Sequence, residues 1–166
     1  MSEQPYVVGI YTAPAPGAPM EPHDMVEVIA GIGIPGDRYA SKTGHWSAPR
    51  WPDKELTLVE AEVADDLKLP VELFRRNVAI RGAQLLGLIG LRFRIGDVEF
   101  AGMRPCNPCQ YLEELLERPG LLRDLVGHGG LRTQVLVSGH LRIGDEIEVL
   151  GVHDPDLVGI GVEYEQ

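Results

Sequence analysis

The segment LRFRIGDVEF, residues 91–100, decides the fold class of this chain. Apolar and charged residues alternate strictly along residues 91–95 and again along 98–100, with Gly96 and Asp97 between the two runs. Such alternation is typical of a strand that buries one face, and a Gly-Asp pair between two alternating runs is typical of a tight turn. The segment therefore predicts an antiparallel β-hairpin.

The letters Arg-Ile-Gly-Asp of this hairpin return at residues 142–145, where a second alternating run follows at 147–149. We expect a second hairpin there. The shared letters are open to two explanations, an internal duplication or the separate use of the same turn chemistry.

Short strands and helices are expected elsewhere along the chain. Further strand patterns occur at residues 7–11, 25–30, 56–58, 77–80 and 133–137. Short helices are expected at residues 61–67, 71–74, 109–117 and 121–126. The spacing of Thr57 and Glu60 matches a capping box at the start of the first helix, and Pro70 ends it. Because strands outnumber helices, the sequence predicts a mainly β fold, an antiparallel barrel with a few short helices.

Length and composition restrict the class of protein. The 166 residues predict a single domain over 1–166, with a core at about 7–150 and an acidic tail at 151–166. The net charge of −10 argues against nucleic-acid binding or an anionic membrane surface, which need a basic footprint. The first residues have neither a basic nor an apolar stretch, so we expect no secretion signal and a cytoplasmic location.

A glycine pattern at residues 31–36 matches the letters of a dinucleotide-binding fingerprint. That fingerprint needs a helix whose N-terminus receives the pyrophosphate. Here Pro35 interrupts the pattern and residues 37–44 have no apolar periodicity, so a turn is expected instead.

Arginine supplies most of the positive charge, with twelve Arg against three Lys. Arg75, Arg76 and Arg81 fall within seven residues, and Arg104 lies two residues before the first cysteine. A guanidinium group holds an oxyanion or phosphate with two hydrogen bonds, which an ammonium group cannot do. The arginine content is thus open to two explanations, genomic base composition or a site for a small anion.

The two cysteines lie in the segment Cys106-Asn107-Pro108-Cys109. Pro108 suits the start of a helix, so Cys109 is expected where free backbone N–H groups and the helix dipole favour an anion. The pKa of a thiol, about 8.5 when unperturbed, is lowered at such positions, and Cys109 is therefore our candidate nucleophile or metal ligand.

Four interpretations of this segment are open. A redox dithiol would need a thioredoxin-like setting, which this chain lacks. A zinc site would need four ligands, and one cysteine pair with His128 remains short of them. The cysteines could also be inert loop residues. We favour the fourth interpretation, a single thiolate that ligates a soft metal or carries sulfur.

Two other segments offer groups that hold anions. Arg75, Arg76 and Asn77 precede a predicted strand. Residues 127–132 form a glycine-rich turn whose backbone N–H groups suit a phosphate, with Arg132 beside them.

The chain resembles the MOSC family, named for the C-terminal domain of molybdenum cofactor sulfurase. Seven features carry the resemblance in the family's order and together span residues 7–150. They are Gly36-Asp37-Arg38-Tyr39, Leu56-Thr57-Leu58 before a Glu-rich helix, Arg75-Arg76-Asn77, Leu88-Ile89-Gly90, Pro108-Cys109, Gly129-Gly130-Leu131-Arg132 and Arg142-Ile143-Gly144-Asp145.

The resemblance implies a β-barrel with a reactive cysteine at the position of Cys109. In some members this cysteine is thought to carry sulfur as a persulfide. In members similar to the amidoxime-reducing component, the cysteine ligates molybdenum held by a pterin, and the enzyme reduces N-hydroxylated compounds. An Arg-x-Asn element there helps to hold the pterin phosphate, which matches Arg75 and Asn77. We therefore expect Cys109 as metal ligand and catalytic residue, with Arg75, Asn77, Arg104 and Arg132 binding the molybdenum cofactor.

Some features of the relatives are missing from these 166 residues. They contain no pyridoxal-phosphate desulfurase domain and no ferredoxin-type cysteine set, so a separate cysteine desulfurase or electron donor is an expected partner, beside a small-molecule substrate. The loop 12–22 has no Lys-Ser pair of the kind that contributes to the pterin site. A metal-free persulfide carrier for cofactor or metal–sulfur assembly is the alternative. Cys106 adds a second thiol, suited to resolve a persulfide on Cys109 or to form a disulfide with it.

Overall fold

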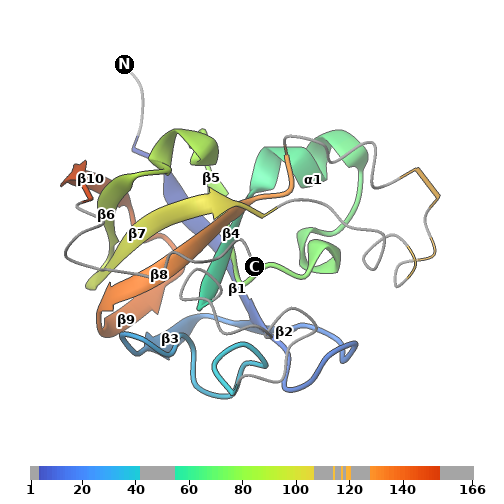
Figure 1. The fold of residues 1–166 in the computed structure, drawn as a ribbon. Coiled ribbons are helices and arrows are strands. Elements are labelled where there is room, and N and C mark those ends of the chain that lie inside the picture. Colours follow the sequence, from blue (N-terminus) through green and yellow to red (C-terminus); the bar gives the residue numbers. More distant parts are fainter. Residues whose placement is uncertain are drawn as a thin grey trace, which may run out of the picture.

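The computed structural model describes residues 4–41, 55–106, 114, 117, 119–120 and 128–153. These residues form a mainly β domain with a few short helices (Figure 1). The strands are β1 (Tyr6–Thr12), β2 (Glu21–His23), β3 (Met25–Val28), β4 (Leu56–Glu60), β5 (Val78–Arg81), β6 (Leu91–Ile95), β7 (Val98–Pro105), β8 (Leu131–Val137), β9 (Gly139–Arg142) and β10 (Ile147–Val152). The helices are α1 (Ala61–Leu67) and two 3₁₀ turns, η2 (Val71–Phe74) and η3 (Leu85–Leu88).

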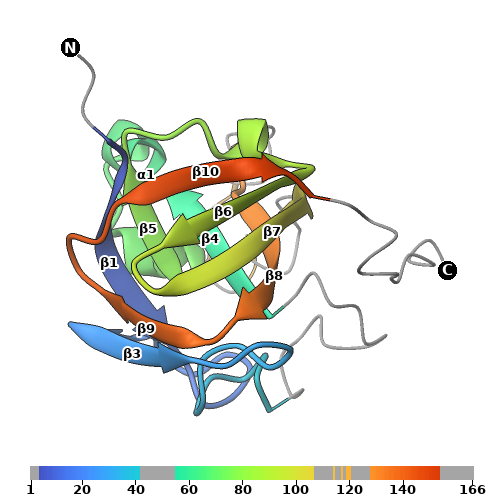
Figure 2. The same ribbon diagram turned by 90° about the vertical axis from the view of Figure 1, so that its left-hand side faces the viewer.

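Eight strands form one curled sheet in the order β10-β6-β7-β8-β4-β5-β1-β2, and β3 pairs with β9 in a second, two-stranded sheet. The large sheet curls into a half-barrel. Figure 2 shows β1 beside the beginning of β10, where Val7 N–H donates to the Asp145 carbonyl at 2.9 Å and Gly144 N–H to the Val7 carbonyl at 2.8 Å. The predicted mainly β fold with a few short helices is confirmed.

One strand pair departs from the predicted antiparallel arrangement. β4 and β5 run parallel, with Leu58 opposite Val78. A parallel pair needs a crossover between its strands, and here α1 and η2 supply it. Helix α1 covers the side of β4 and β5 away from the barrel interior (Figure 1).

The hairpin predicted at residues 91–100 is confirmed as β6 and β7, which pair with Ile95 opposite Val98. Four apolar residues of the hairpin, Phe93, Ile95, Val98 and Phe100, are fully buried in the barrel core, and the rings of Phe93 and Phe100 stack with centroids 5.4 Å apart. Burial of each such ring stabilises the fold by about 2–3 kcal/mol.

The second predicted hairpin is wrong. β9 pairs with β3, whereas β10 pairs with β6, placing Ile147 opposite Ile95. The turn itself forms, since Arg142 N–H donates to the Asp145 carboxylate at 2.8 Å. However, the Gly144 N–H donates to Val7 of β1 and the Asp145 carbonyl accepts from it, so the chain turns away from β9 and continues to β6.

The helix predicted at residues 61–67 is confirmed as α1, but its capping box is wrong. Glu60 is the N-cap and makes no side-chain capping bond. Its carboxylate accepts a hydrogen bond from Leu85 N–H at 2.9 Å instead, and Thr57 lies within β4. Both polar side chains of the predicted capping box therefore bond to residues distant in the chain, Glu60 to Leu85 and Thr57 to Asn77.

The glycine pattern at residues 31–36 forms a turn, as expected. Gly33 N–H donates to the Ile29 carbonyl at 2.9 Å, and no helix follows within residues 34–41.

The helices predicted at residues 109–117 and 121–126, and most of the predicted acidic tail, lie outside the described residues; β10 continues to Val152. Among the helices that the structure describes, none is long and apolar enough to span a membrane.

Candidate functional site

Several of the predicted site residues lie in one row across the large sheet. Arg104 on β7 is directly opposite Arg132 on β8, and Arg132 is directly opposite Thr57 on β4. Thr57 in turn bonds to Asn77, the residue before β5. Directly opposed residues of an antiparallel pair share a face of the sheet, so the fold brings Arg104 and Arg132 onto the face of Thr57.

Arg104 and Arg132 thus place two positive charges at directly opposed positions, where like charges destabilise a strand pair unless other groups compensate them. Within the described part of the chain, the guanidinium group of Arg132 makes no hydrogen bond and no ion pair. Its positive charge is thus left without a carboxylate, in a chain whose net charge is −10.

Other arginines of the chain are neutralised by carboxylates. Five arginines form ion pairs with described carboxylates, namely Arg38 with Asp37, Arg81 with Asp65, Arg92 with Glu99, Arg94 with Glu148, and Arg142 with Asp97. Among the described residues, Arg76 and Arg132 form none. The arginines without carboxylates lie beside the two segments from which the sequence predicted anion binding.

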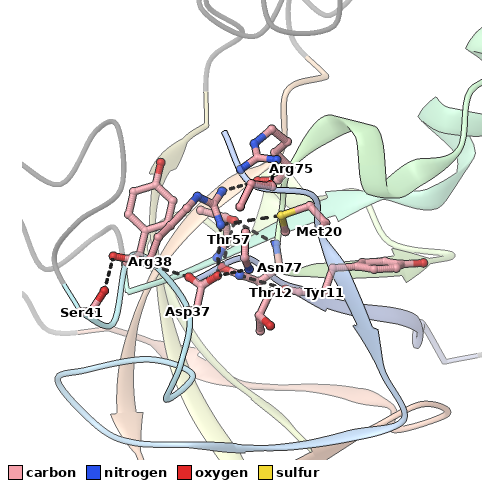
Figure 3. Close-up of polar contacts among 12 residues, drawn as sticks. Tyr11, Thr12, Met20, Asp37, Arg38, Ser41, Thr57, Arg75 and Asn77 are labelled. Atoms are coloured by element: carbon pink, nitrogen blue, oxygen red, sulfur yellow. Dashed lines mark hydrogen bonds and ion pairs between the residues drawn. The ribbon is translucent and has the colours of Figure 1, made fainter. Parts of the chain in front are cut away.

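Asn77 is buried and holds three strands together (Figure 3). Its side-chain oxygen accepts hydrogen bonds from the Thr57 N–H at 3.1 Å and the Thr57 hydroxyl at 3.3 Å. Its side-chain NH₂ donates to the Tyr11 carbonyl at 3.1 Å. The amide of Asn77 therefore connects the end of β1 and the beginning of β4 to the start of β5.

Arg75 is also buried, at 8% exposure, and it adopts the left-handed conformation with φ 61°. One guanidinium N–H donates to the carbonyl of Ala18 at 2.6 Å. The backbone carbonyl of Arg75 accepts a hydrogen bond from Arg38 at 3.0 Å (Figure 3). The segment that contains Ala18 and Arg38 therefore fixes both the backbone and the side chain of this residue.

Asp37 and Arg38 form a buried ion pair beside Arg75, and the sequence alone predicted no site role for either residue. The two side chains are 1% and 4% exposed and lie 3.1 Å apart. Both carboxylate oxygens of Asp37 also accept backbone N–H groups, from Ala13 at 3.0 Å and Tyr39 at 3.1 Å. The motif Gly36-Asp37-Arg38-Tyr39 was the available signal, but nothing local indicates that Arg38 reaches residue 75.

The side chain of Arg76 contacts the glycine turn before β8, which Arg75 does not contact in any bond described above. Its Nε donates to the Gly129 carbonyl at 2.8 Å and its Nη1 to the Phe74 carbonyl at 3.1 Å. The next carbonyl of the turn, that of Gly130, accepts the N–H of Cys106 at 2.8 Å. Arg76 thus contacts the glycine turn that also holds the beginning of the cysteine segment.

Gly130 is required in this turn for two reasons. Its φ of 110° is a conformation that residues with a Cβ rarely adopt, and a Cβ there would overlap the carbonyl oxygen of Leu58.

Cys106 is a free cysteine, 7% exposed, immediately after β7. Cys109, the predicted metal ligand and catalytic residue, lies outside the described residues, so its role stays a prediction. Among the residues that the structure describes, no cluster of three or more His, Cys, Asp or Glu side chains is arranged to hold a metal ion.

Tyr11 occupies the end of the same row of residues. Partial burial, together with the nearby carboxylate of Glu72, raises the pKa of the Tyr11 phenol above its usual value of 10.0. The neutral phenol is therefore favoured in the folded protein.

The fold and the sequence define a MOSC domain: the profile of that family matches residues 51–148, more than half of the chain. The chain belongs to the MOSC family. No curated protein matches its sequence.

Solved structures of low sequence identity share its fold. The YuaD protein from Bacillus subtilis superposes with a TM-score of 0.72 at 22% identity, covering 92% of this chain and 100% of that one. YiiM from Escherichia coli gives a TM-score of 0.64 at 18% identity, covering 92% of this chain and 72% of that one. YiiM from Geobacillus stearothermophilus gives 0.68 at 15% identity, covering 88% and 75%.

Proposed function

We propose that this MOSC domain binds the molybdenum cofactor, with the Cys109 thiolate as its protein ligand to the metal. Family membership supports the choice of cofactor. The observation that carries the proposal is the pair of arginines, Arg104 and Arg132, opposed on β7 and β8 at the strand end that leads into the cysteine segment. Guanidinium groups bind a phosphate group with two parallel hydrogen bonds, so this pair suits the phosphate of the cofactor.

The donor set in this region fits an anionic cofactor. Arg132 carries a guanidinium group that no carboxylate neutralises within the described residues. Arg104 faces it across the strands, and we propose that both hold the phosphate. Arg75 and Asn77, which the resemblance assigns to the same role, make the buried backbone contacts described above.

The bound cofactor would supply a redox-active metal for the reduction of N-hydroxylated compounds or for sulfur transfer. A thiolate suits this role because it is a soft ligand for a polarisable metal centre. We propose that a small molecule is the substrate and that a separate protein delivers electrons or sulfur.

Elemental analysis tests the proposal. Protein produced in cells that synthesise the cofactor is expected to contain molybdenum, and Cys109→Ser is expected to lose it. Cys106→Ser is the matched control, because it removes the neighbouring thiol and is expected to retain the metal. Wild-type protein without molybdenum, or Cys109→Ser with a full complement, would refute the proposal.

A second candidate function is that of a metal-free sulfur carrier. Cys106 favours it, since this free thiol lies three residues before Cys109 and its backbone is fixed by Gly130. A thiol so close in the chain is suited to attack a persulfide on Cys109 and release the outer sulfur as sulfide while a disulfide forms. Incubation with a cysteine desulfurase and cysteine should then add one sulfur atom to Cys109, detected by mass spectrometry, and the adduct should persist longer in Cys106→Ser. An unmodified Cys109 would rule this function out.

A further inference from the structure

The last part of β10 is an open edge of the large sheet. β10 ends the strand order, and the chain before β1 reaches it at Ile147, whose N–H donates to the Pro5 carbonyl at 2.9 Å (Figure 2). The side-chain amide of Gln4 donates to the Ile147 carbonyl at 3.1 Å. Beyond this point, no described strand pairs with Val149–Val152 on the side away from β6.

Two side chains of this stretch face the core but are not covered. Val149 lies opposite Phe93, and Val152 lies opposite Leu91. Directly opposed residues share a face of the sheet, and here Phe93 is fully buried while Leu91 packs against the core. Nevertheless Val149 is 52% exposed and Val152 is 84% exposed, whereas Ile147 on the same strand is 4% exposed. The core face of β10 therefore loses its cover where the contact with the chain before β1 ends.

The backbone of the same stretch has hydrogen-bonding groups that point to the open side. The Ile147 N–H points away from β6, and the N–H of Val149, two residues further along the strand, points the same way. The His153 N–H donates to the Gly90 carbonyl on the β6 side at 2.9 Å, so the N–H of its neighbour Val152 points to the open side. No acceptor for the N–H of Val149 or Val152 lies among the described residues.

The opposite edge of the sheet carries the protection that this one lacks. β2 is three residues long, and its Pro22 has no N–H to offer a further strand. Val149–Val152 contains neither a proline nor a charged side chain, and three of its four residues are exposed aliphatics, including Leu150. An open edge of this kind is a template for one more strand.

The chain supplies a segment of matching chemistry soon after β10. In residues 158–165, VGIGVEYE, apolar side chains alternate with glycine and glutamate, which is the pattern of a strand that buries one face. Residues 154–156, Asp-Pro-Asp, are turn-forming. A connection over 153–157 has five residues, within the range of about 2–5 that is usual for hairpin loops, and brings Val158 opposite Val152.

A second copy of the chain fits this edge less well. A stable interface between two chains buries about 800 Å² on each partner, with about 20–30 residues a side. The open stretch of β10 has only the four residues Val149–Val152. A segment attached to the end of β10 needs far less contact area, because its effective concentration at the edge is high.

We infer that residues 158–161 pair antiparallel with Val149–Val152 as a further strand of the large sheet, with Val158 and Ile160 on the core face. The pairing gives the two open N–H groups of β10 carbonyl acceptors and covers its exposed valines. It also removes an edge on which other chains could assemble. The inference is independent of the cofactor.

Amide hydrogen exchange, measured residue by residue by NMR on the full-length protein, tests this pairing. The amides of Val149 and Val152 should exchange more slowly, by about tenfold or more, in the full-length protein than in a variant that ends at His153. The reason is that the added strand provides their acceptors. The amide of Ile147, which is bonded to Pro5, should be equally protected in both proteins.

Two substitutions repeat the test at full length. Ile160→Asp places a charge on the core face, so it should release the amides of Val149 and Val152 as the truncation does. Gly159→Asp is the matched control, because it adds the same charge one residue away on the outer face and should keep the protection. If the variant that ends at His153 does not fold, these two substitutions decide alone.

Three results would overturn the inference. Free exchange of the Val149 and Val152 amides in the full-length protein would show that the edge stays open. Protection that persists in the variant ending at His153, or in Ile160→Asp, would show that another part of the chain, such as residues 1–3, covers the edge. Protection that grows with protein concentration, together with a dimer in sedimentation, would identify a second copy as the occupant. Molybdenum content tests the proposed function separately.

Discussion

Replacement of Arg38 by methionine should destabilise the protein far more than the same change at an exposed arginine. Arg38 and Asp37 are 4% and 1% exposed, so the substitution leaves a carboxylate buried without its counter-charge. Breaking such a buried pair costs about 3–5 kcal/mol. The Arg75 carbonyl also loses its donor, and an unpaired buried carbonyl costs about 1–3 kcal/mol. Methionine retains most of the apolar stem, so the loss reports chiefly on the charge and its hydrogen bonds.

Arg81→Met is the matched control. Its ion pair with Asp65 has nearly the same length, 3.0 Å against 3.1 Å, but the two side chains are 38% and 61% exposed. An exposed pair contributes about 0–1 kcal/mol. Because the two ion pairs have nearly equal N···O distances, a difference in the free energy of unfolding between the two variants reports the effect of burial.

Urea and thermal unfolding measure the effect. For a domain of this length each kcal/mol shifts Tm by about 2–4 °C, so Arg38→Met should lower Tm by roughly 6–20 °C. The double variant Asp37→Asn, Arg38→Met removes both charges and should recover part of the loss. The reasoning is refuted if Arg38→Met and Arg81→Met lie within about 1 kcal/mol of each other.

Two further predictions concern a turn and a phenol. Gly130→Ala should destabilise the fold by several kcal/mol more than Gly144→Ala, measured by urea unfolding: both glycines have positive φ (110° and 93°), but only at Gly130 does the added Cβ meet a backbone atom, the Leu58 oxygen. Equal losses would contradict this steric argument. Burial and Glu72 raise the pKa of Tyr11, so the folded state binds the phenolic proton more tightly than the unfolded state does. The free energy of unfolding should therefore fall as the pH rises above about 10. Tyr11→Phe should reduce that fall in unfolding measurements between about pH 9 and 11. An unchanged slope in the variant would show that other groups cause it.

Local patterns predicted the parts of the fold that local interactions form. The alternation along residues 91–100 fixes which side chains of β6 and β7 face the core, and the Gly96-Asp97 turn brings the two strands together without help from elsewhere. Helix α1 follows in the same way from its apolar spacing and from Pro70 after it.

Predictions failed where distant groups competed for the same atoms. Residues 141–149 contain the letters of a hairpin, but Gly144 and Asp145 hydrogen-bond to Val7, more than 130 residues away in the chain. Likewise, the capping-box partners Thr57 and Glu60 bond to Asn77 and Leu85. Spacing along the chain carries no information about such competitors.

The sequence alone determined the family and the mainly β architecture, because these follow from residue order and periodicity. Only the tertiary structure decided which arginines keep an uncompensated charge. Neighbours in the chain such as Arg75 and Arg76 contact different segments, one the loop after β1 and the other the glycine turn beside Cys106. The reason is physical: the charge on a guanidinium is neutralised or left available by groups that the fold brings within about 4 Å of it, and these come from other strands.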